Sequence, residues 1–173
     1  MTFAYAGIGS RETPDPILAL MTTLATHFAA GGLRLRTGGA TGADQAFMRG
    51  ADPELYVPWQ GYNNYFGKTP SPESFEVAAR YHPVFSRLSE GAQKMHARNV
   101  EIVLGPDLKS PVRFVVCWTP DGAVAETTSK TGGTGGAIRV AAAHGIKVWN
   151  LQRHEDFEYV SGLVGVTEPV LVW

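Results

Sequence analysis

Short apolar runs alternate with helix-like segments along this chain of 173 residues, and this alternation limits the fold more than any other feature. In the first third of the chain, apolar periodicity and glycine or proline punctuation place the segments in the order β-α-β-α-β. They are a strand over 3–8, a helix opened by Pro14 and Pro16 and closed by Gly31-Gly32, a strand over 33–37, a short helix over 43–51 and a strand over 54–59. This order predicts parallel strands joined by crossover helices.

The same alternation continues after a long loop over 60–72. We predict one helix from Pro83 to Leu104, a buried strand over 113–119, a helix over 136–144 and a strand over 146–151. The tail suits a helix over 154–164 and an edge strand over 168–173. The predicted fold is therefore α/β: one Rossmann-like, three-layer, doubly wound domain over residues 1–173, with a mostly parallel sheet and helices on both faces.

Composition excludes several classes of protein. Fifteen Lys and Arg against sixteen Asp and Glu leave a formal charge of −1, which disfavours a strong nonspecific nucleic-acid binder. The single cysteine, Cys117, lies in an apolar run, reads as a small buried hydrophobe and cannot form an internal disulfide. There is no signal-peptide pattern and no apolar stretch long enough to span a bilayer, so we predict a cytoplasmic protein without a membrane partner.

Three polar or glycine-rich loops follow or precede predicted elements: GSR at 9–11, TGGATGAD at 37–44 and TGGTGG at 131–136. In an open parallel sheet, such loops meet beyond the carboxyl ends of the strands. Bare backbone N–H groups and the positive end of a following helix favour an anion there. The alternative is that the glycines only make tight turns. Neither longer loop completes a P-loop or a GxGxxG pattern, which weakens an ATPase or NAD reading.

The segment KMHARNVEIVLG contains the second group of candidate residues. Arg98 suits a bidentate phosphate clamp, and Asn99 suits a base or ribose contact. The alternative for Arg98 is a surface ion pair with Glu101, three residues on. His82 and His96 have no third ligand beside them, so we predict no metal and no cofactor, and His82 would then simply cap a helix.

These loops and this helix define the predicted site. Asp44 is expected either to accept a ribose or base hydrogen bond or to complement the dipole of its helix. The predicted nucleotide- or phosphate-binding residues are Gly9, Ser10, Arg11, Gly38, Gly39, Thr41, Gly42, Asp44, Arg98, Asn99, Gly132, Gly133, Thr134 and Gly135. The candidate catalytic residues are Arg98, Glu12 and Asp44.

Taken in order, GIGSR, TGGATGAD and TGGTGGAIRVAAAHGIKVWNL resemble the SLOG superfamily, which includes Smf/DprA proteins, Lonely Guy phosphoribohydrolases and small YspA-like proteins. The likeness is closest to small YspA-like or phage-associated DprA-like members. In the phosphoribohydrolases, two glycine motifs and an arginine form the nucleotide monophosphate site. Residues 38, 39 and 42, Arg98, and residues 132, 133 and 135 match those motifs. The resemblance also implies a homodimer.

This sequence departs from the phosphoribohydrolase pattern at one position that matters for chemistry. The catalytic Glu falls on Arg139, whereas hydrolysis of an N-glycosidic bond needs a carboxylate. Glu12, Asp44, Asp121 and Glu126 are alternative sources of that group.

Three functions follow from these observations. The first is binding of a nucleotide or nucleotide derivative, with cleavage or transfer at its N-glycosidic bond if the protein is an enzyme. The second is a noncatalytic sensor or sink for a nucleotide signal. The third, less favoured, is DprA-like binding of single-stranded DNA by Tyr62, Tyr65 and Phe66 beside Arg11 and Lys68. The alternative for these aromatic residues is packing of their loop on the domain surface.

Overall fold

A computed structural model describes residues 2–165 of the chain. Five strands form one sheet in which every pair of neighbours is parallel, in the order β3-β2-β1-β4-β5. The strands are β1 (Ala4–Gly7), β2 (Arg34–Thr37), β3 (Pro53–Leu55), β4 (Phe114–Cys117) and β5 (Lys147–Asn150). The predicted α/β, Rossmann-like class is confirmed, and the sheet is wholly parallel.

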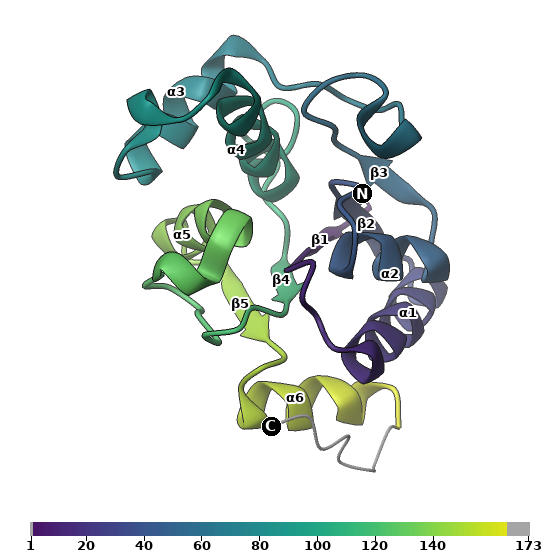
Figure 1. The fold of residues 1–173 in the computed structure, drawn as a ribbon. Helices are drawn as coiled ribbons and strands as arrows, with labels where there is room; N and C mark the ends of the chain where they lie inside the picture. Colours follow the sequence, from purple (N-terminus) through teal and green to yellow (C-terminus); the bar gives the residue numbers. More distant parts are fainter. Residues whose placement is uncertain (1, 166–173) are drawn as a thin grey trace.

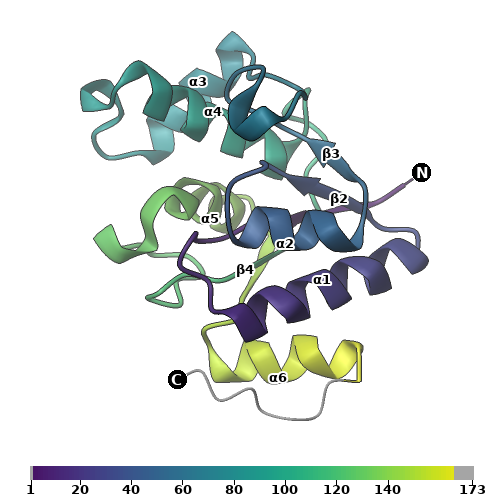
Figure 2. The ribbon, with the colours of Figure 1, turned by 45° about the vertical axis from the view of Figure 1, so that its right-hand side comes forward.

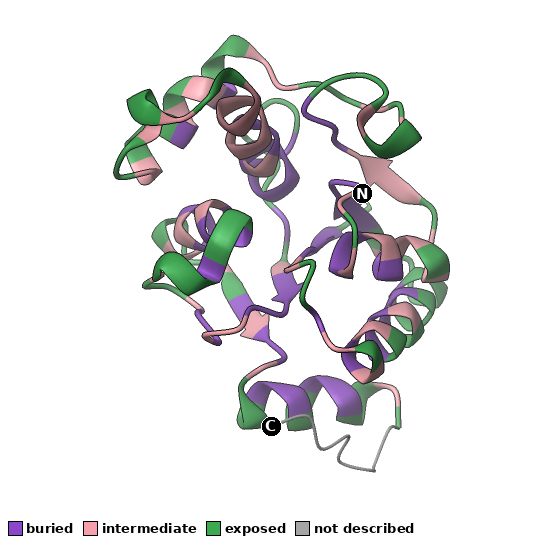
Figure 3. Cartoon of the chain, viewed as in Figure 1, coloured by how far each residue is buried: buried purple, intermediate pink, exposed green. Residues whose placement is uncertain are grey.

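Within residues 2–165, six α-helices lie on the two sides of this sheet (Figures 1 and 2). One face carries α1 (Asp15–Ala30), α2 (Ala43–Gly50) and α6 (His154–Leu163), and the other carries α3 (Pro72–Tyr81), α4 (Glu90–Leu104) and α5 (Gly135–Ala143). Along β1, Tyr5 packs with the first set, whereas Ala4 and Ala6 pack with the second. Since both faces of the central strands are covered, every residue of β1 is buried, as are the last three residues of β2 and of β4 (Figure 3).

The strand order contains a switch point. From β1 the chain builds outward through β2 and β3, then returns past β1 to add β4 and β5 on its other side. The connections that leave β1 and β4 therefore diverge, one toward each edge of the sheet. In sheets of this kind the crevice at the carboxyl ends of two such strands is where ligands bind.

Most predicted elements are confirmed within a residue or two, but the predicted helix over 83–104 begins too early. The α-helix starts at Glu90, where the Ser89 hydroxyl accepts a hydrogen bond from the Ala92 N–H and caps it. The preceding residues form a separate helix, α3, and a single 3₁₀ turn over Phe85–Arg87. The tail helix is present as α6, and the edge strand suggested over 168–173 lies outside the described residues. Over residues 2–165, no helix is long and apolar enough to cross a membrane.

Candidate ligand-binding site

A cavity of about 900 Å³ lies at the carboxyl ends of β1 and β4, at the switch point of the sheet. This volume is in the range of small-molecule sites. The cavity is lined by residues 8–12 after β1, by the α4 face that carries Ala92, Met95, His96 and Asn99, and by residues 129–134 before α5, with Ala40, Asp44, Tyr62, Arg98 and Pro120 between them.

The structure brings part of the predicted site together around this cavity. The predicted residues in its wall are Gly9, Ser10, Arg11, Glu12, Asp44, Arg98, Asn99, Gly132, Gly133 and Thr134. Gly38, Gly39, Thr41, Gly42 and Gly135 are outside the wall. The glycines of the first loop therefore lie behind the surface of the cavity, which this loop reaches only through Ala40 and Asp44, whereas the second glycine loop forms part of that surface.

The glycines of the first loop are explained by packing inside the protein. A Cβ on Gly38 would lie 2.5 Å from Arg98 Nη1, and a Cβ on Gly42 would lie 2.8 Å from Arg11 Cα. Gly39 has a positive φ of 71°, and a Cβ there would lie 2.9 Å from Tyr65 Cδ2. At these positions glycine permits close approach of side chains and of the 9–11 loop, so the turn-and-packing alternative accounts for this loop.

The glycines of the second loop have a different environment. Gly132 and Gly133 are exposed in the cavity wall, and a Cβ on either would meet no atom within 4 Å. Gly132 has a positive φ of 69°, which favours glycine, but Gly133 has no such conformation. Neither backbone conformation nor packing within the chain requires glycine at 133. Close approach of a ligand to the backbone is a physical reason that remains.

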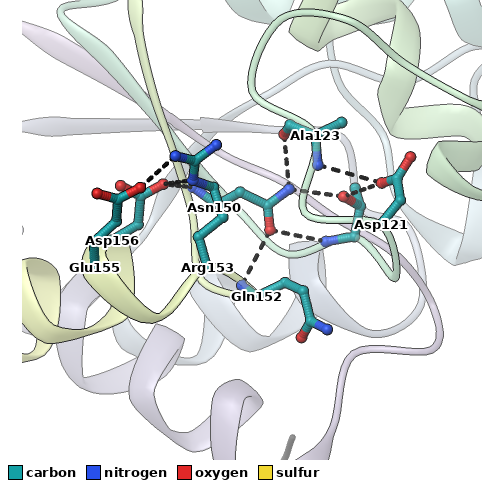
Figure 4. Close-up of polar contacts among 8 residues, drawn as sticks. Asp121, Ala123, Asn150, Gln152, Arg153, Glu155 and Asp156 are labelled. Atoms are coloured by element: carbon teal, nitrogen blue, oxygen red, sulfur yellow. Dashed lines mark hydrogen bonds and ion pairs between the residues drawn. The ribbon is translucent and has the colours of Figure 1, made fainter.

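A chain of hydrogen bonds connects the end of β5 to Asp121 (Figure 4), which in turn binds the second loop. The Asn150 backbone N–H donates to Asp156 Oδ2 at 3.1 Å, which fixes the residue at the start of the turn into α6. Its side-chain amide donates to Thr119 Oγ1 at 2.7 Å, and Thr119 in turn donates to Asp121 Oδ1 at 2.9 Å. The buried amide of Asn150 thus fixes the loop that carries Asp121.

Asp121 holds the second glycine loop in place. Its Oδ2 atom accepts hydrogen bonds from the hydroxyls of Thr128, at 2.7 Å, and of Thr131. Partial burial acts to raise the pKa of Asp121, but the hydroxyl donors Thr131, Thr128 and Thr119 outweigh it and lower the pKa to about 2. With these donors already on its oxygens, Asp121 is a structural carboxylate and lies outside the cavity wall.

Arg98 and Asn99 line the cavity, and their side chains donate hydrogen bonds to other protein groups of its wall and of the loop behind it. Arg98 is only 5% exposed, donates from Nη1 to the carbonyl of Gly38 at 2.6 Å and from Nε to Asn99 at 2.8 Å. The Asn99 amide donates to the Gly133 carbonyl at 3.0 Å. The suggested surface ion pair between Arg98 and Glu101 is wrong: both residues are buried, and Glu101 accepts hydrogen bonds at the start of α3.

Arg139, which stands at the position of the phosphoribohydrolase Glu, is not in the cavity wall. Its Nη1 donates to the Thr127 hydroxyl and its Nε donates to the carbonyl of Tyr81, the last residue of α3. This side chain therefore joins α3 and α5 instead of adding a cation to the site.

Asp44 is the buried carboxyl group of the cavity. It is 4% exposed, and its Oδ2 atom accepts from the N–H groups of Gly38, at 3.1 Å, and Ala40, at 3.3 Å. Burial raises the pKa of Asp44 to about 6, although the charge of Arg98 and the backbone donors oppose the rise. Among the four carboxylates considered from sequence, Glu12 is exposed in the wall and Glu126 is exposed outside it. Of these four carboxyl groups, Asp44 alone is both buried and in the cavity wall.

The cavity also contains residues that sequence reasoning did not assign to the nucleotide site. Lys130 adds a cation at the second loop, Tyr62 lies with its ring centre 5.5 Å from Arg98 Cζ, and His96 lies one turn before Asn99. The helical spacing of His96 and Asn99 is a signal that was available in the sequence. His82 accepts a hydrogen bond from the Val84 N–H, just after α3 ends. Within residues 2–165, no three His, Cys, Asp or Glu side chains are grouped to hold a metal ion.

The aromatic loop divides into packed and exposed residues. Tyr65 packs on Gly39, Tyr62 faces the cavity, and Phe66 is 75% exposed. Lys68 pairs with Glu54 at 3.2 Å and lies over the Tyr56 ring. Surface packing therefore accounts for Tyr65 but not for Phe66.

Fold and site together define the class: a doubly wound, Rossmann-like protein with a ligand-sized cavity at its switch point. No protein-family model matches the chain, and no curated protein matches it. The solved structure of DNA processing protein A from Helicobacter pylori, which concerns the single-stranded DNA binding mode of that protein, is similar to it in fold. The TM-score is 0.38 at 14% identity, and the match covers 96% of this chain and 82% of that chain.

Proposed function

We propose that this protein binds a nucleotide or a nucleotide derivative in the switch-point cavity. The observation that carries the proposal is the open glycine pair Gly132-Gly133, which lies in the cavity wall without a packing reason for Gly133. These residues lead into the N-terminus of α5, where the helix dipole favours an anion. Lys130 and Arg11 add positive charge around the same cavity.

The remaining walls suit the uncharged part of such a ligand. Tyr62 and Met95 offer an aromatic ring and a polarizable thioether for a base. Asp44 offers a buried carboxyl group for a ribose hydroxyl. Membership of the SLOG superfamily, among small YspA-like or phage-associated DprA-like members, is part of this proposal, as are a homodimer and a cytoplasmic location.

The first experiment is mass spectrometry of small molecules released from the purified protein, followed by calorimetry with ribonucleoside mono- and diphosphates. Gly133→Ala should weaken binding at least about tenfold, because its Cβ enters the space of the ligand. Gly162→Ala is the matched control, since its Cβ also meets nothing within 4 Å but lies on α6 outside the cavity wall. Wild-type protein that binds no nucleotide, or equal affinities for the three proteins, would refute the proposal.

The same incubation separates an enzyme from a sensor or sink. Release of free base and ribose phosphate would establish cleavage of the N-glycosidic bond. Asp44→Asn should then abolish turnover, whereas binding should be largely kept because the amide oxygen can still accept from a ribose hydroxyl. Recovery of the intact nucleotide after long incubation would establish a binder.

Binding of single-stranded DNA is the second candidate, and one observation favours it. Phe66 is 75% exposed and Trp59 is 38% exposed, and the Trp59 ring centre lies 5.5 Å from that of Tyr62 at the cavity. Stacking of a base on such a ring contributes about 1–3 kcal/mol. Fluorescence anisotropy with a labelled oligonucleotide should then show affinity that falls steeply with salt and falls again in Phe66→Ala. An absence of binding at low salt would remove this candidate.

A further inference from the structure

His96 differs from its polar neighbours on the α4 wall of the cavity. Arg98 and Asn99 donate hydrogen bonds to the protein, as described above. His96 lines the same cavity, and its Nδ1 atom is buried without a hydrogen-bond partner among residues 2–165. A buried nitrogen without a partner needs a physical reason, because such groups are rare in folded proteins.

The surroundings of Nδ1 indicate which ring nitrogen of His96 carries the proton. A Cβ on Gly136 would lie 2.9 Å from it, so Nδ1 faces the first turn of α5. The first N–H groups of a helix are free of helical partners and form its positive end. A lone pair on Nδ1 faces the positive end of this helix favourably, whereas a proton there would face it unfavourably. The proton of the neutral ring therefore belongs on Nε2.

His96 is also kept uncharged. Burial lowers its pKa to about 4, and the charges of His82, Arg139 and Arg98 add to this. The His82 ring, beyond the end of α3, lies 4.6 Å from the His96 ring between centres. The carboxyl groups that share the cavity are Asp44, which is buried and hydrogen-bonded, and Glu12, on the exposed 9–12 segment. At neutral pH the ring is thus a neutral group with one N–H.

We propose that His96 is a binding residue that donates a hydrogen bond from Nε2 to a phosphate oxygen of the ligand. The inference rests on the proposed nucleotide binding and assigns to this chain a donor that neither glycine loop supplies. Nδ1 is buried beside α5 and His96 lines the cavity, so the ligand contact is assigned to the other ring nitrogen, Nε2. A phosphate at the N-terminus of α5 would lie next to this donor.

Three substitutions at one position separate the donor from the shape of the ring. His96→Gln places an amide N–H near the position of Nε2 and should bind ribonucleoside 5′-monophosphates within about threefold of the wild type. His96→Asn reaches only toward Nδ1, and His96→Phe keeps a ring without a donor. Both should lose at least about tenfold in affinity, the usual cost of one hydrogen bond to a charged group. Inorganic phosphate is the second probe and should show the same order.

Gly136→Ala tests the same contact without changing His96, because its Cβ would displace the ring from 2.9 Å. Thermal denaturation of each variant separates loss of fold from loss of binding. The protonated nitrogen is measured directly in the free protein by ¹⁵N-¹H correlation spectra of the histidine rings at pH 7. We expect Nε2–H and a bare Nδ1.

Outcomes for the two proposals differ. If the wild type binds nucleotides and His96→Phe binds them equally well, the role of His96 is refuted and the proposed function stands. A proton on Nδ1, or a doubly protonated ring at pH 7, would also overturn the role of His96. If the wild type binds none of the probes, the proposed function fails, and the ligand contact of His96 fails with it.

Discussion

Asp44 and Arg98 hold opposite ends of the same residue, Gly38. The Gly38 N–H donates to Asp44 Oδ2 at 3.1 Å, and its carbonyl accepts from Arg98 Nη1 at 2.6 Å. A buried carboxyl group from α2 and a buried guanidinium group from α4 are thereby joined through one residue of the loop that follows β2. The first glycine loop is thus fixed from both sides before any ligand arrives.

Gly38→Ala should lower the free energy of unfolding by about 1–3 kcal/mol, because its Cβ would overlap Arg98 Nη1 at 2.5 Å. Gly133→Ala should change it by less than about 0.5 kcal/mol, since its Cβ meets nothing within 4 Å. Urea denaturation of the two variants checks both values. Equal losses of stability would show that the loops do not differ in the way their packing indicates.

The pH dependence of stability should reveal Asp44. Its pKa is raised to about 6 in the folded protein from a usual value of 3.8, so the folded state binds more protons than the unfolded state between these values. Stability from this group is therefore lost as pH rises from about 4 to 6, by up to about 3 kcal/mol. Asp44→Asn should remove this slope in urea titrations at a series of pH values. Parallel profiles for wild type and variant would contradict the assignment.

Arg98→Lys should destabilise the protein by about 2–3 kcal/mol although the charge is kept. A lysine cannot donate to Asn99, Gly38 and Tyr56 in the fixed directions of a guanidinium group. Arg87→Lys, at an exposed position, is the control and should be neutral. Thermal melts that coincide for the two variants would show that the charge alone matters at residue 98.

Asp121→Asn should loosen the second glycine loop without unfolding the domain. The asparagine amide has only one oxygen and places an NH2 group where the second carboxylate oxygen was. The hydroxyls of Thr128 and Thr131 therefore compete with Thr119 for one acceptor. Amide hydrogen exchange over 128–134 should accelerate at least about tenfold, while exchange in β1 and β4 stays unchanged. Glu126→Gln, an exposed change in the same segment, should leave both rates alone. Unchanged exchange in Asp121→Asn would exclude this anchoring role.

The sequence predicted the sheet well because β1, β4 and β5 are short, largely apolar runs ended by polar loops and β2 alternates apolar and polar residues. The predicted strand over 54–59 is shorter in the structure, where β3 ends at Leu55. It missed α3, since the residues this helix buries are Ser74 and Ala78, which give no apolar periodicity. It began α4 too early because Val84 and Leu88 continue the apolar spacing, although Val84 is 43% exposed. Apolar spacing cannot distinguish a helix from a turn that packs beside one.

For the site, the sequence predicted which segments come together better than it predicted the role of each residue in them. Gly38 and Gly133 belong to similar motifs, yet one is confined by packing and the other is open. That difference arises from Arg98, which lies sixty positions beyond Gly38, on α4. Local patterns contain no information about such a contact, because it is created by the crossover of the chain between β3 and β4.

The cavity walls come from segments that lie far apart in the chain. Residues 8–12 leave the ribosome early, whereas residues 129–134 and the Asn150 that anchors their loop leave late. A nascent or truncated chain that ends before β5 thus lacks the complete wall, however well its first strands pair. Occupancy of the cavity would report that both halves of the sheet have joined.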